Sequence, residues 1–208
     1  DPAMWWEAVR LAIKKCMDTL WQRGRKPLEI RAVTVDGTSG TVVPLDEKKR
    51  PLRDALMYND MRAADQAVKI HEHAGELEKK MGYVFNASFA LPKILWIKEQ
   101  EPQVYKKTKY MVHQSDYIVG RFTGEYGVTD YSNALKSGFD MKEEVWPNLL
   151  DLLELDRRIF PSVIPPGQVI GNVTKEIAEE FGFSSDAVVA AGATDGYVSA
   201  ISTGAVKR

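Results

Sequence analysis

A run of small apolar residues that leads directly into a glycine-rich turn constrains the fold of this chain most strongly. Residues 187–191 are all alanine or valine, a pattern typical of a strand buried on both faces. The turn 192–196 reads Gly-Ala-Thr-Asp-Gly, and a helix is expected to begin at residues 197–202. A buried strand that turns into a helix indicates an α/β layered architecture. Ligands of open α/β sheets bind at the carboxyl ends of strands, so we expect a site at this turn.

Helical and extended patterns alternate along the rest of the chain. Asp1 and Pro2 suit the cap and first turn of a helix, and apolar residues then recur at helical spacing. We expect helices over residues 2–22, 60–81 with a possible break at Gly75, 92–100, 115–123 capped by Ser115, 144–155, and 175–181 capped by Thr174. β-branched runs predict strands over residues 30–35 and 42–46, joined by the turn 36–41, with a polar hairpin tip at 46–51. The proline-rich segment 161–167 is expected to be a loop.

Composition narrows the class of protein. The 208 residues predict one large domain, or one domain and part of another. A net charge of −1 is unlike the basic face of nucleic-acid-binding proteins. No apolar run approaches the length of about 18 residues that spans a bilayer. We therefore expect a protein that binds neither nucleic acid nor membrane.

The first predicted helix carries the only cysteine, Cys16, on its apolar face. A lone cysteine cannot form an internal disulfide, which fits a reducing compartment and predicts a cytoplasmic protein. Trp5, Trp6 and Trp21 lie on or near the same apolar stripe, so we expect all three in the core.

The turn 192–196 offers groups suited to phosphate chemistry. Gly192 and Gly196 would let the backbone approach a phosphate, and a helix N-terminus presents N–H groups and a positive dipole end to anions. Asp195 lies where the turn meets the helix, where its carboxylate could accept a proton or bind a metal. The alternative is that Asp195 only caps the helix, a position where aspartate is common.

Two other segments carry clustered polar side chains. Thr38 and Ser39 lie in the turn 36–41, and their hydroxyls could donate to and accept from a polyol, or could simply be turn residues. This turn lacks the Gly-Lys-Ser/Thr ending of a phosphate-binding P-loop. Asn59 and Asp60 lie at a loop-to-helix junction, where either could be a cap.

The remaining polar residues favour structural roles. Thr129 and Asp130 begin a turn after a helix that ends in glycine, which indicates capping. His71 and His73 are two apart on a predicted helix and point to different sides, so we expect no metal site there. His113 is expected in a strand near the surface.

In their order along the chain, several segments resemble the FGGY family of carbohydrate kinases. Residues 1–6 resemble its D-P-x-x-W-W helix entry, and residues 35–46 its sugar-contacting hairpin. Residues 57–63 resemble W-x-D-x-R, and residues 89–96 resemble T-x-x-K-x-x-W. Residues 115–134 resemble R-L-T-G followed by T-D-x-S-x-A, residues 165–171 P-x-G-x-x-x-G, and residues 192–195 G-x-x-D. The motifs lie in register over nearly the whole chain.

The resemblance implies an actin-like, RNase H-like α/β fold with a mixed sheet flanked by helices. It also implies ATP-dependent phosphorylation of a sugar hydroxyl, with Mg²⁺ neutralising phosphate charge. Asp195 falls on the family's catalytic base. The implied substrate-binding residues are Thr38, Ser39, Asn59 and Asp60, and the implied phosphate loop is Gly192, Thr194 and Gly196.

The hairpin departs from two patterns of the family. Xylulose kinases typically carry Q-M-H-G there and glycerol kinases an R-E pair, whereas this chain has Thr38-Ser39-Gly40. This argues against glycerol and favours a ketopentose, D-xylulose or D-ribulose. We expect residues 1–208 to be a sugar-binding N-terminal domain without the family's first strands and its ATP domain, inactive by itself, from a protein that could form a homodimer.

Two other classes of function stay open. One is a non-catalytic actin-like domain that binds sugar in a regulatory role. The other is a metal-dependent phosphatase or hydrolase that uses Asp195 and Asp130. A kinase requires an acceptor sugar, whereas a hydrolase would release phosphate without one.

Overall fold

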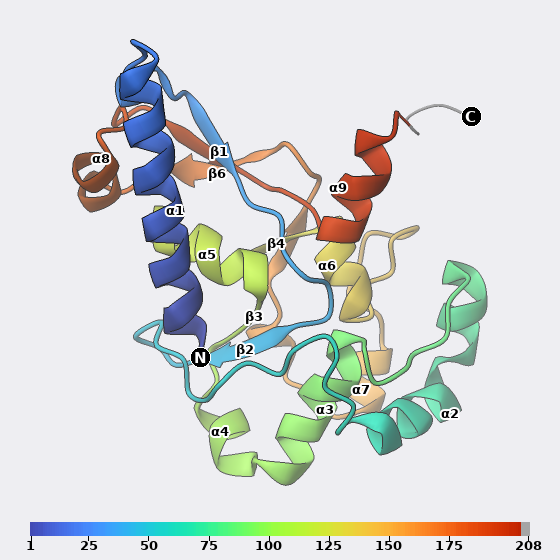
Figure 1. The fold of residues 1–208 in the computed structure, drawn as a ribbon. Helices are drawn as coiled ribbons and strands as arrows, with labels where there is room; N and C mark the ends of the chain where they lie inside the picture. Colours follow the sequence, from blue (N-terminus) through green and yellow to red (C-terminus); the bar gives the residue numbers. More distant parts are fainter. Residues whose placement is uncertain (205–208) are drawn as a thin grey trace.

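The strands pair in three small sheets in this computed structural model, which describes residues 1–204 (Figure 1). One sheet has the order β1-β7-β6, and the other two are the pairs β2-β3 and β4-β5. The strands are β1 (Ala32–Thr34), β2 (Val42–Leu45), β3 (Tyr110–His113), β4 (Val128–Asp130), β5 (Ser162–Ile164), β6 (Val169–Asn172) and β7 (Val188–Ala190).

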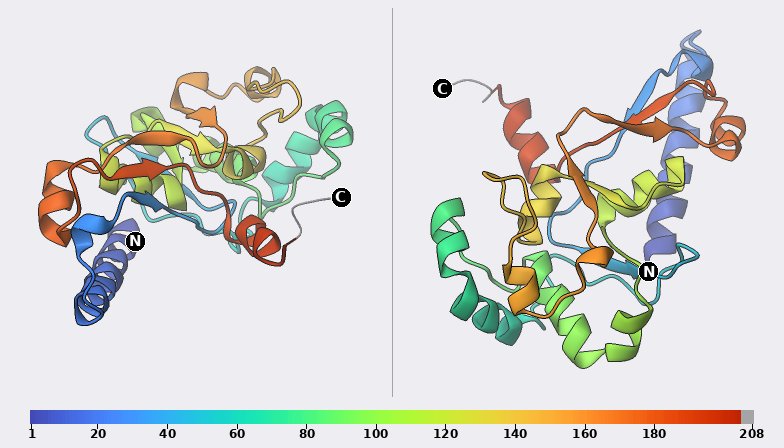
Figure 2. Two further views of the ribbon diagram at one scale, coloured as in Figure 1. Left: turned by 90° about the horizontal axis from the view of Figure 1, so that it is seen from above. Right: turned by 180° about the vertical axis from the view of Figure 1, so that it is seen from behind.

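Helices surround these sheets. In chain order they are α1 (Pro2–Gln22), α2 (Ala64–Met81), α3 (Ala90–Gln100), α4 (Pro102–Lys107), α5 (Gln114–Thr123), α6 (Tyr131–Lys136), α7 (Leu149–Leu152), α8 (Lys175–Phe181) and α9 (Asp195–Ser202), with short 3₁₀ turns at η1 (Pro27–Glu29) and η2 (Arg157–Ile159). Helix α5 contacts β2 and β3 of one sheet and β6 and β7 of another, so it links two of the sheets. Helix α9 projects from the rest of the chain (Figure 2).

The buried strand predicted at residues 187–191 is confirmed as β7, but the predicted hairpin between residues 30 and 46 is wrong. Strand β1 pairs in parallel with β7, and β2 pairs antiparallel with β3. Every residue of β2 is buried, whereas β1 is largely exposed at a sheet edge. A fully buried strand needs partners inside the core, and β3 provides one. The polar tip is confirmed, since the Asp46 N–H donates to the Arg50 carbonyl at 3.0 Å.

Helix ends follow the sequence where a capping side chain is present. The Asp1 carboxylate accepts the Ala3 N–H at 2.8 Å, and Thr174 caps α8 as predicted. Helix α2 begins four residues later than predicted and runs unbroken through Gly75, and α3 begins two residues earlier. Helix α5 is capped at His113 and not at Ser115, because Asp116 accepts the His113 N–H.

Two predictions for the second half of the chain are wrong. The helix predicted over residues 144–155 shrinks to α7, because Glu144 has a φ of 55° and Pro147 interrupts the preceding turn. The predicted loop 161–167 contains strand β5, which pairs in parallel with β4. Both strands are only three residues long, too short for a clear alternating pattern.

Two hydrophobic clusters form the core. One lies among α2, α3, α7 and β2, and the other lies among α1, α5, α8 and β7. Trp6 is buried and Trp5 packs against the second cluster, as predicted, but Trp21 is 59% exposed. Cys16 is exposed as well, because the distal half of α1 packs less of its surface against the core. None of the helices within residues 1–204 has the length and apolar character needed to cross a bilayer.

Candidate active site at the strand ends

The turn after β7 and the turn after β1 are joined through their backbones. Gly37 and Thr194 form a parallel bridge, and the Asp195 N–H donates to the Gly37 carbonyl at 2.9 Å. This bridge continues the parallel pairing of β1 with β7 beyond the strand ends. The two polar turns identified in the sequence therefore lie side by side, at the carboxyl edge of the sheet.

Gly192 is required by packing between the two strands. A Cβ atom at this position would lie 2.8 Å from the carbonyl carbon of Val35 and closer still to its oxygen. By contrast, a Cβ atom on Gly196 would have no neighbouring atom within 4 Å. The glycine at 192 thus lets β7 approach β1, and its predicted approach to a phosphate stays a prediction.

Asp195 is the first residue of α9, with Thr194 as the N-cap, so it is not itself the cap. Its side chain is exposed, and its Oδ1 accepts the Gly196 N–H at 2.7 Å. The Thr194 N–H donates to Ser132 Oγ at 2.8 Å, and the Asp195 N–H is taken by Gly37. The amides of residues 194–196 therefore have partners within the protein, and they do not fit a bound phosphate as they stand.

A cavity of about 510 Å³ opens between α6 and α9. Its lining includes Ser39, Ser132, Thr194 and Lys136, together with Tyr197 on α9. Asp195 itself does not line the cavity, but Thr194 and Gly196 on either side of it do. The apolar residues Leu135, Met141, Pro166 and Ala200 complete the lining. A mainly apolar wall with a few hydroxyls and one cation is typical of a site for a small molecule.

Thr38 is held in place by its neighbours. Its hydroxyl donates to Gln114 Oε1 at 2.8 Å and lies 2.8 Å from Thr41 Oγ1, and its N–H donates to the same Gln114 oxygen. Thr41 Oγ1 also accepts the Tyr58 N–H at 3.0 Å, so it links this turn to the segment that carries Asn59. Of the two hydroxyl residues predicted to bind substrate, only Ser39 lines the cavity. Gln114 and Thr41 were not predicted, because neither stands in a local pattern.

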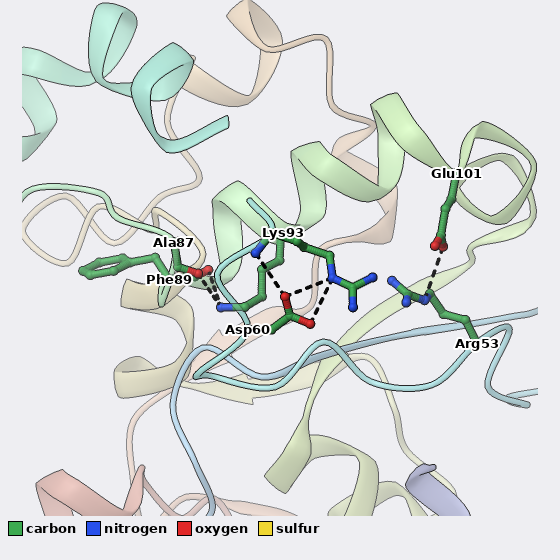
Figure 3. A network of polar contacts seen from close by, with 7 residues as sticks. Arg53, Asp60, Ala87, Phe89, Lys93 and Glu101 are labelled. Atoms are coloured by element: carbon green, nitrogen blue, oxygen red, sulfur yellow. Dashed lines mark hydrogen bonds and ion pairs between the residues drawn. The ribbon is translucent and has the colours of Figure 1, made fainter. Parts of the chain in front are cut away.

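Asp60 belongs to a network of charged side chains that also includes Arg62 and Lys93 (Figure 3). Its carboxylate lies 2.9 Å from Arg62 Nε, whereas the side chain of Asn59 is exposed. Nearby Lys93 is fully buried, and its Nζ donates to the carbonyls of Ala87 at 2.7 Å and Phe89 at 3.2 Å. Burial lowers the pKa of Lys93 to about 8, against the opposing effect of the Asp60 charge.

The buried position of Lys93 was not predicted, although the sequence holds a signal for it. Lys93 is the one charged residue among apolar residues 89–97, so the helix there has no polar face to expose it. Its ammonium fixes the loop 87–89 before α3. The carbonyl of Ser88 in that loop is the group that a Cβ on Gly40 would strike. Lys93 thus fixes the loop that packs against Gly40 in the turn 36–41.

Asp130 caps α6, as predicted, and bonds to Ser132, which lines the cavity. Its carboxylate accepts the N–H groups of Ser132 at 2.8 Å and Asn133 at 3.2 Å, and the Asn133 Nδ2 group at 2.6 Å. Ser132 Oγ donates to the same carboxylate and accepts the Thr194 N–H. Asp130 is 4% exposed, so its oxygens are occupied by local donors rather than open to a ligand.

A second buried carboxyl lies behind Asp130. Asp116 accepts the His113 N–H at 2.9 Å and the Thr129 hydroxyl at 3.0 Å. Burial, and then the charge of Asp130, raise the pKa of Asp116 to about 8. His113 is 2% exposed, so its predicted place near the surface is wrong, and burial lowers its pKa to about 4. Its strand β3 is covered by β2 on one side and by α5 next in the chain.

The first of the two histidines on α2 has a partner on its own helix. Nδ1 of His71 lies 2.6 Å from Glu78 Oε2, an intrahelical contact two turns along α2. Within residues 1–204, no three or more His, Cys, Asp or Glu side chains gather as metal ligands would.

Comparison with known proteins places this geometry in a family. The model of the FGGY family of carbohydrate kinases, N-terminal domain, matches residues 1–202. The chain belongs to this family. The xylulose kinase of Streptomyces coelicolor is 32% identical over 209 residues, covering 98% of this chain and 41% of that protein. The xylulose kinase of Escherichia coli is 26% identical over 208 residues and is covered to 42% of its length.

Solved structures of sugar kinases share the fold. The structure of xylulose kinase from Rhodospirillum rubrum has a TM-score of 0.89 at 28% identity. The match covers 100% of this chain and 42% of the Rhodospirillum rubrum chain. A structure from Brucella ovis, also titled as a xylulose-type kinase, has a TM-score of 0.91 at 25% identity, with the same coverage of 100% and 42%. The FGGY chain therefore has the actin-like ATPase fold of these sugar kinases. It spans about two fifths of the length of the curated relatives it matches.

Proposed function

We propose that the protein carrying this chain transfers a phosphoryl group from ATP to a hydroxyl of a sugar, with a ketopentose, D-xylulose or D-ribulose, as the acceptor. The observation that carries the proposal is the joined pair of turns after β1 and β7, in a chain of the FGGY family. These turns lie beside a cavity whose lining includes the hydroxyl residues Ser39, Ser132 and Thr194. The relatives named xylulose kinase support the ketopentose. Residues 1–208 would be the sugar-binding N-terminal domain of the longer protein.

In this proposal Asp195 is the general base. Its carboxylate is exposed at the start of α9 and bonded only to the neighbouring Gly196 N–H, so it is accessible to an acceptor hydroxyl. As the hydroxyl oxygen bonds to phosphorus and the bond to the leaving oxygen of the donor breaks, the hydroxyl proton passes to Asp195. Phosphoryl transfer depends mainly on positioning and charge stabilisation, so a weakly basic carboxylate is sufficient.

Sugar contacts are assigned to both sides of the joined turns. Ser39 lines the cavity, and Thr38 orients the turn through Gln114. We assign Asp60, with its Arg62 partner, and the exposed Asn59 to the rim of the sugar site.

ATP and Mg²⁺ enter the proposal through the family. The amides of residues 194–196 already have partners, and residues 1–204 hold no cluster of three metal ligands, so the described residues do not fit the donor phosphates or the metal. We therefore assign donor binding to the part of the longer protein outside this chain, and the predicted phosphate-loop role of Gly192, Thr194 and Gly196 stays a prediction.

One of the two alternatives is weakened by the geometry. A hydrolase that pairs Asp195 with Asp130 needs a free carboxylate at both positions, whereas Asp130 accepts four donors from Ser132 and Asn133. A regulatory, non-catalytic domain would bind sugar without turnover.

The test is to incubate the full-length protein with Mg-ATP and a panel of D-xylulose, D-ribulose, other ketoses, pentitols and glycerol. Mass spectrometry then identifies any sugar phosphate. We expect one ketopentose to be phosphorylated and glycerol to be left unchanged. Sugar binding without any sugar phosphate would favour the regulatory alternative, and phosphate release without an acceptor would favour a hydrolase.

A further inference from the structure

The position of Asp195 depends on how the start of α9 is fixed. None of the residues Asp195–Ser202 is buried, and the helix projects from the sheets (Figure 2). Thr194, directly before it, is only 6% exposed. Packing therefore holds the body of α9 weakly, and the contacts of the preceding turn set where the Asp195 carboxylate lies.

Two hydrogen bonds within residues 1–204 tie the backbone at the start of α9 to other elements. The Asp195 N–H donates to the Gly37 carbonyl at 2.9 Å, in the segment after β1. The Thr194 N–H donates to Ser132 Oγ at 2.8 Å, in the first turn of α6. The first bond joins two backbone groups, so it does not depend on a side chain. The second depends on a single hydroxyl, that of Ser132.

The hydroxyl of Ser132 is itself held in one orientation. Its hydrogen is donated to the carboxylate of Asp130, which is buried and caps α6. A hydroxyl has one hydrogen and two lone pairs, so the oxygen remains free to accept the Thr194 N–H. One oxygen atom therefore connects the cap of α6 with the cap of α9.

The chemistry assigned to Asp195 is sensitive to its position. A general base must lie about 3 Å from the hydroxyl whose proton it takes, and a displacement of about 1 Å can cost a hundredfold in rate. Loss of the bond to Ser132 would release the amide directly before Asp195. The sugar contacts assigned to Ser39 and Asn59 lie on other segments and would stay in place.

We propose that Ser132 is a positioning residue for phosphoryl transfer, which acts through Asp195 by fixing the first turn of α9. The proposal rests on the proposed function, since it takes Asp195 to be the general base. Removal of the hydroxyl then displaces the base but not the sugar, so kcat falls while the KM for the sugar changes little.

The first experiment compares the steady-state kinetics of full-length variants with Mg-ATP and the ketopentose that the product assay identifies. We expect Ser132→Ala to lower kcat about tenfold or more and to change the sugar KM less than about threefold. Ser132→Thr, which keeps the hydroxyl, should retain most of the turnover. Ser132→Val has the shape of threonine without the hydroxyl, so it should lose turnover as alanine does, and it replaces the alanine variant if that variant does not fold.

Ser137→Ala is the matched control. Ser137 lies at the other end of α6 and is 2% exposed, and its Oγ lies 3.0 Å from His113 Nε2. The change removes a buried hydroxyl from the same helix without touching Thr194, so we expect a lower Tm and an unchanged kcat. An equal loss of kcat in Ser137→Ala and Ser132→Ala would overturn the proposal. A higher sugar KM with unchanged kcat in Ser132→Ala would also overturn it, since Ser132 would then be a sugar ligand.

A double-mutant cycle tests whether Ser132 acts through Asp195. In the Asp195→Asn background, where the base is already absent, we expect Ser132→Ala to change the residual turnover less than about twofold. The same loss in both backgrounds would show that Ser132 acts independently of Asp195, which contradicts the proposal.

Amide hydrogen exchange tests the anchoring without turnover. We expect Ser132→Ala to speed exchange at residues 194–198 about tenfold and Ser137→Ala to leave it unchanged. Unchanged exchange in Ser132→Ala would overturn the proposal even if kcat falls. If the wild type phosphorylates no sugar, the proposed function fails in the product assay whatever the exchange rates are, so the two failures are distinguishable.

Discussion

Two strand-to-helix junctions in this chain carry the same dipeptide, Thr-Asp, and use it in opposite ways. At the junction of β4 and α6, Thr129 is followed by Asp130, which is the N-cap and accepts four hydrogen bonds. At the junction of β7 and α9, Thr194 is the N-cap and Asp195 is the first helical residue. A shift of one residue in the start of the helix thus separates a buried carboxylate from an exposed one.

Long-range pairing sets this difference. The turn after β7 is fixed by its bridge to Gly37 and by the bond from Thr194 to Ser132, and the backbone then continues directly into α9. At the other junction the paired residue is Asp130 itself, which lies opposite Ile164 of β5, and its carboxylate accepts local donors from the first turn of α6. The comparison indicates that Asp130 has a structural role at the start of α6, whereas the carboxylate of Asp195 remains exposed and accessible to a ligand. Ser132, which bonds to both junctions, links them.

The largest effect on stability is expected for Asp130→Ala. The change removes a helix cap and leaves the buried Asn133 side-chain amide without its carboxylate partner. Loss of a cap and an unsatisfied buried donor together cost about 3 kcal/mol of unfolding free energy. Urea denaturation measures this cost, with Asp195→Ala as the matched control, for which we expect a change of less than about 0.5 kcal/mol. Equal losses in both variants would remove the distinction between the junctions.

The next effect is expected at the turn that precedes Asp195. Gly192→Ala places a Cβ against the Val35 carbonyl, and overpacking of this kind costs about 2 kcal/mol of unfolding free energy. The matched control is Gly196→Ala, where the Cβ meets open space within α9 and the helix gains from the better propensity of alanine. Thermal unfolding of the two variants is the measurement. A similar Tm for both would contradict the packing role of Gly192.

A smaller effect is expected in the pH dependence of stability. The pKa of Asp116 is raised to about 8 in the folded protein, so folding binds a proton that is lost as the pH rises through 8, and stability falls. Below pH 6.5 the lowered pKa of His113, about 4, opposes this fall, because the unfolded chain then binds more protons at histidine. Above pH 8 the lowered pKa of Lys93, also about 8, makes stability rise again for the same reason.

These signs predict a decrease of about 1 kcal/mol in unfolding free energy between pH 6.5 and pH 8, followed by an increase. Denaturation curves across this range measure it. Asp116→Asn, which cannot titrate, should flatten the decrease and leave the increase above pH 8. A decrease that persists in Asp116→Asn would assign it to another group.

Local signals in the sequence predicted the parts of the fold that local interactions determine. The caps at Asp1 and Thr174, the polar tip after β2 and the buried run at β7 were all recognisable. The partners of β1 and β2 were not, because each pairs with a strand far along the chain while the turn between them resembles a hairpin. Tertiary contacts decide such pairings, and no short window of sequence contains them.

The candidate site was predictable to a similar degree. Motifs pointed to Asp195 and Ser39, which the fold brings to adjacent turns. The side chains that hold these turns, Gln114 and Lys93, act across sequence gaps and have no motif of their own except the apolar setting of Lys93. Lys136 was missed because a lysine near a helix end is usually solvated, and only the fold places it against Phe89.

The most direct test of the account is to measure turnover and stability together for Asp195→Asn in the full-length protein. If the exposed aspartate is the general base, kcat for the preferred ketopentose falls about a hundredfold or more, while the unfolding free energy stays within about 0.5 kcal/mol of the wild type. Retained turnover, or a loss of stability comparable to that of Asp130→Ala, would contradict the account and make Asp195 a structural residue of α9.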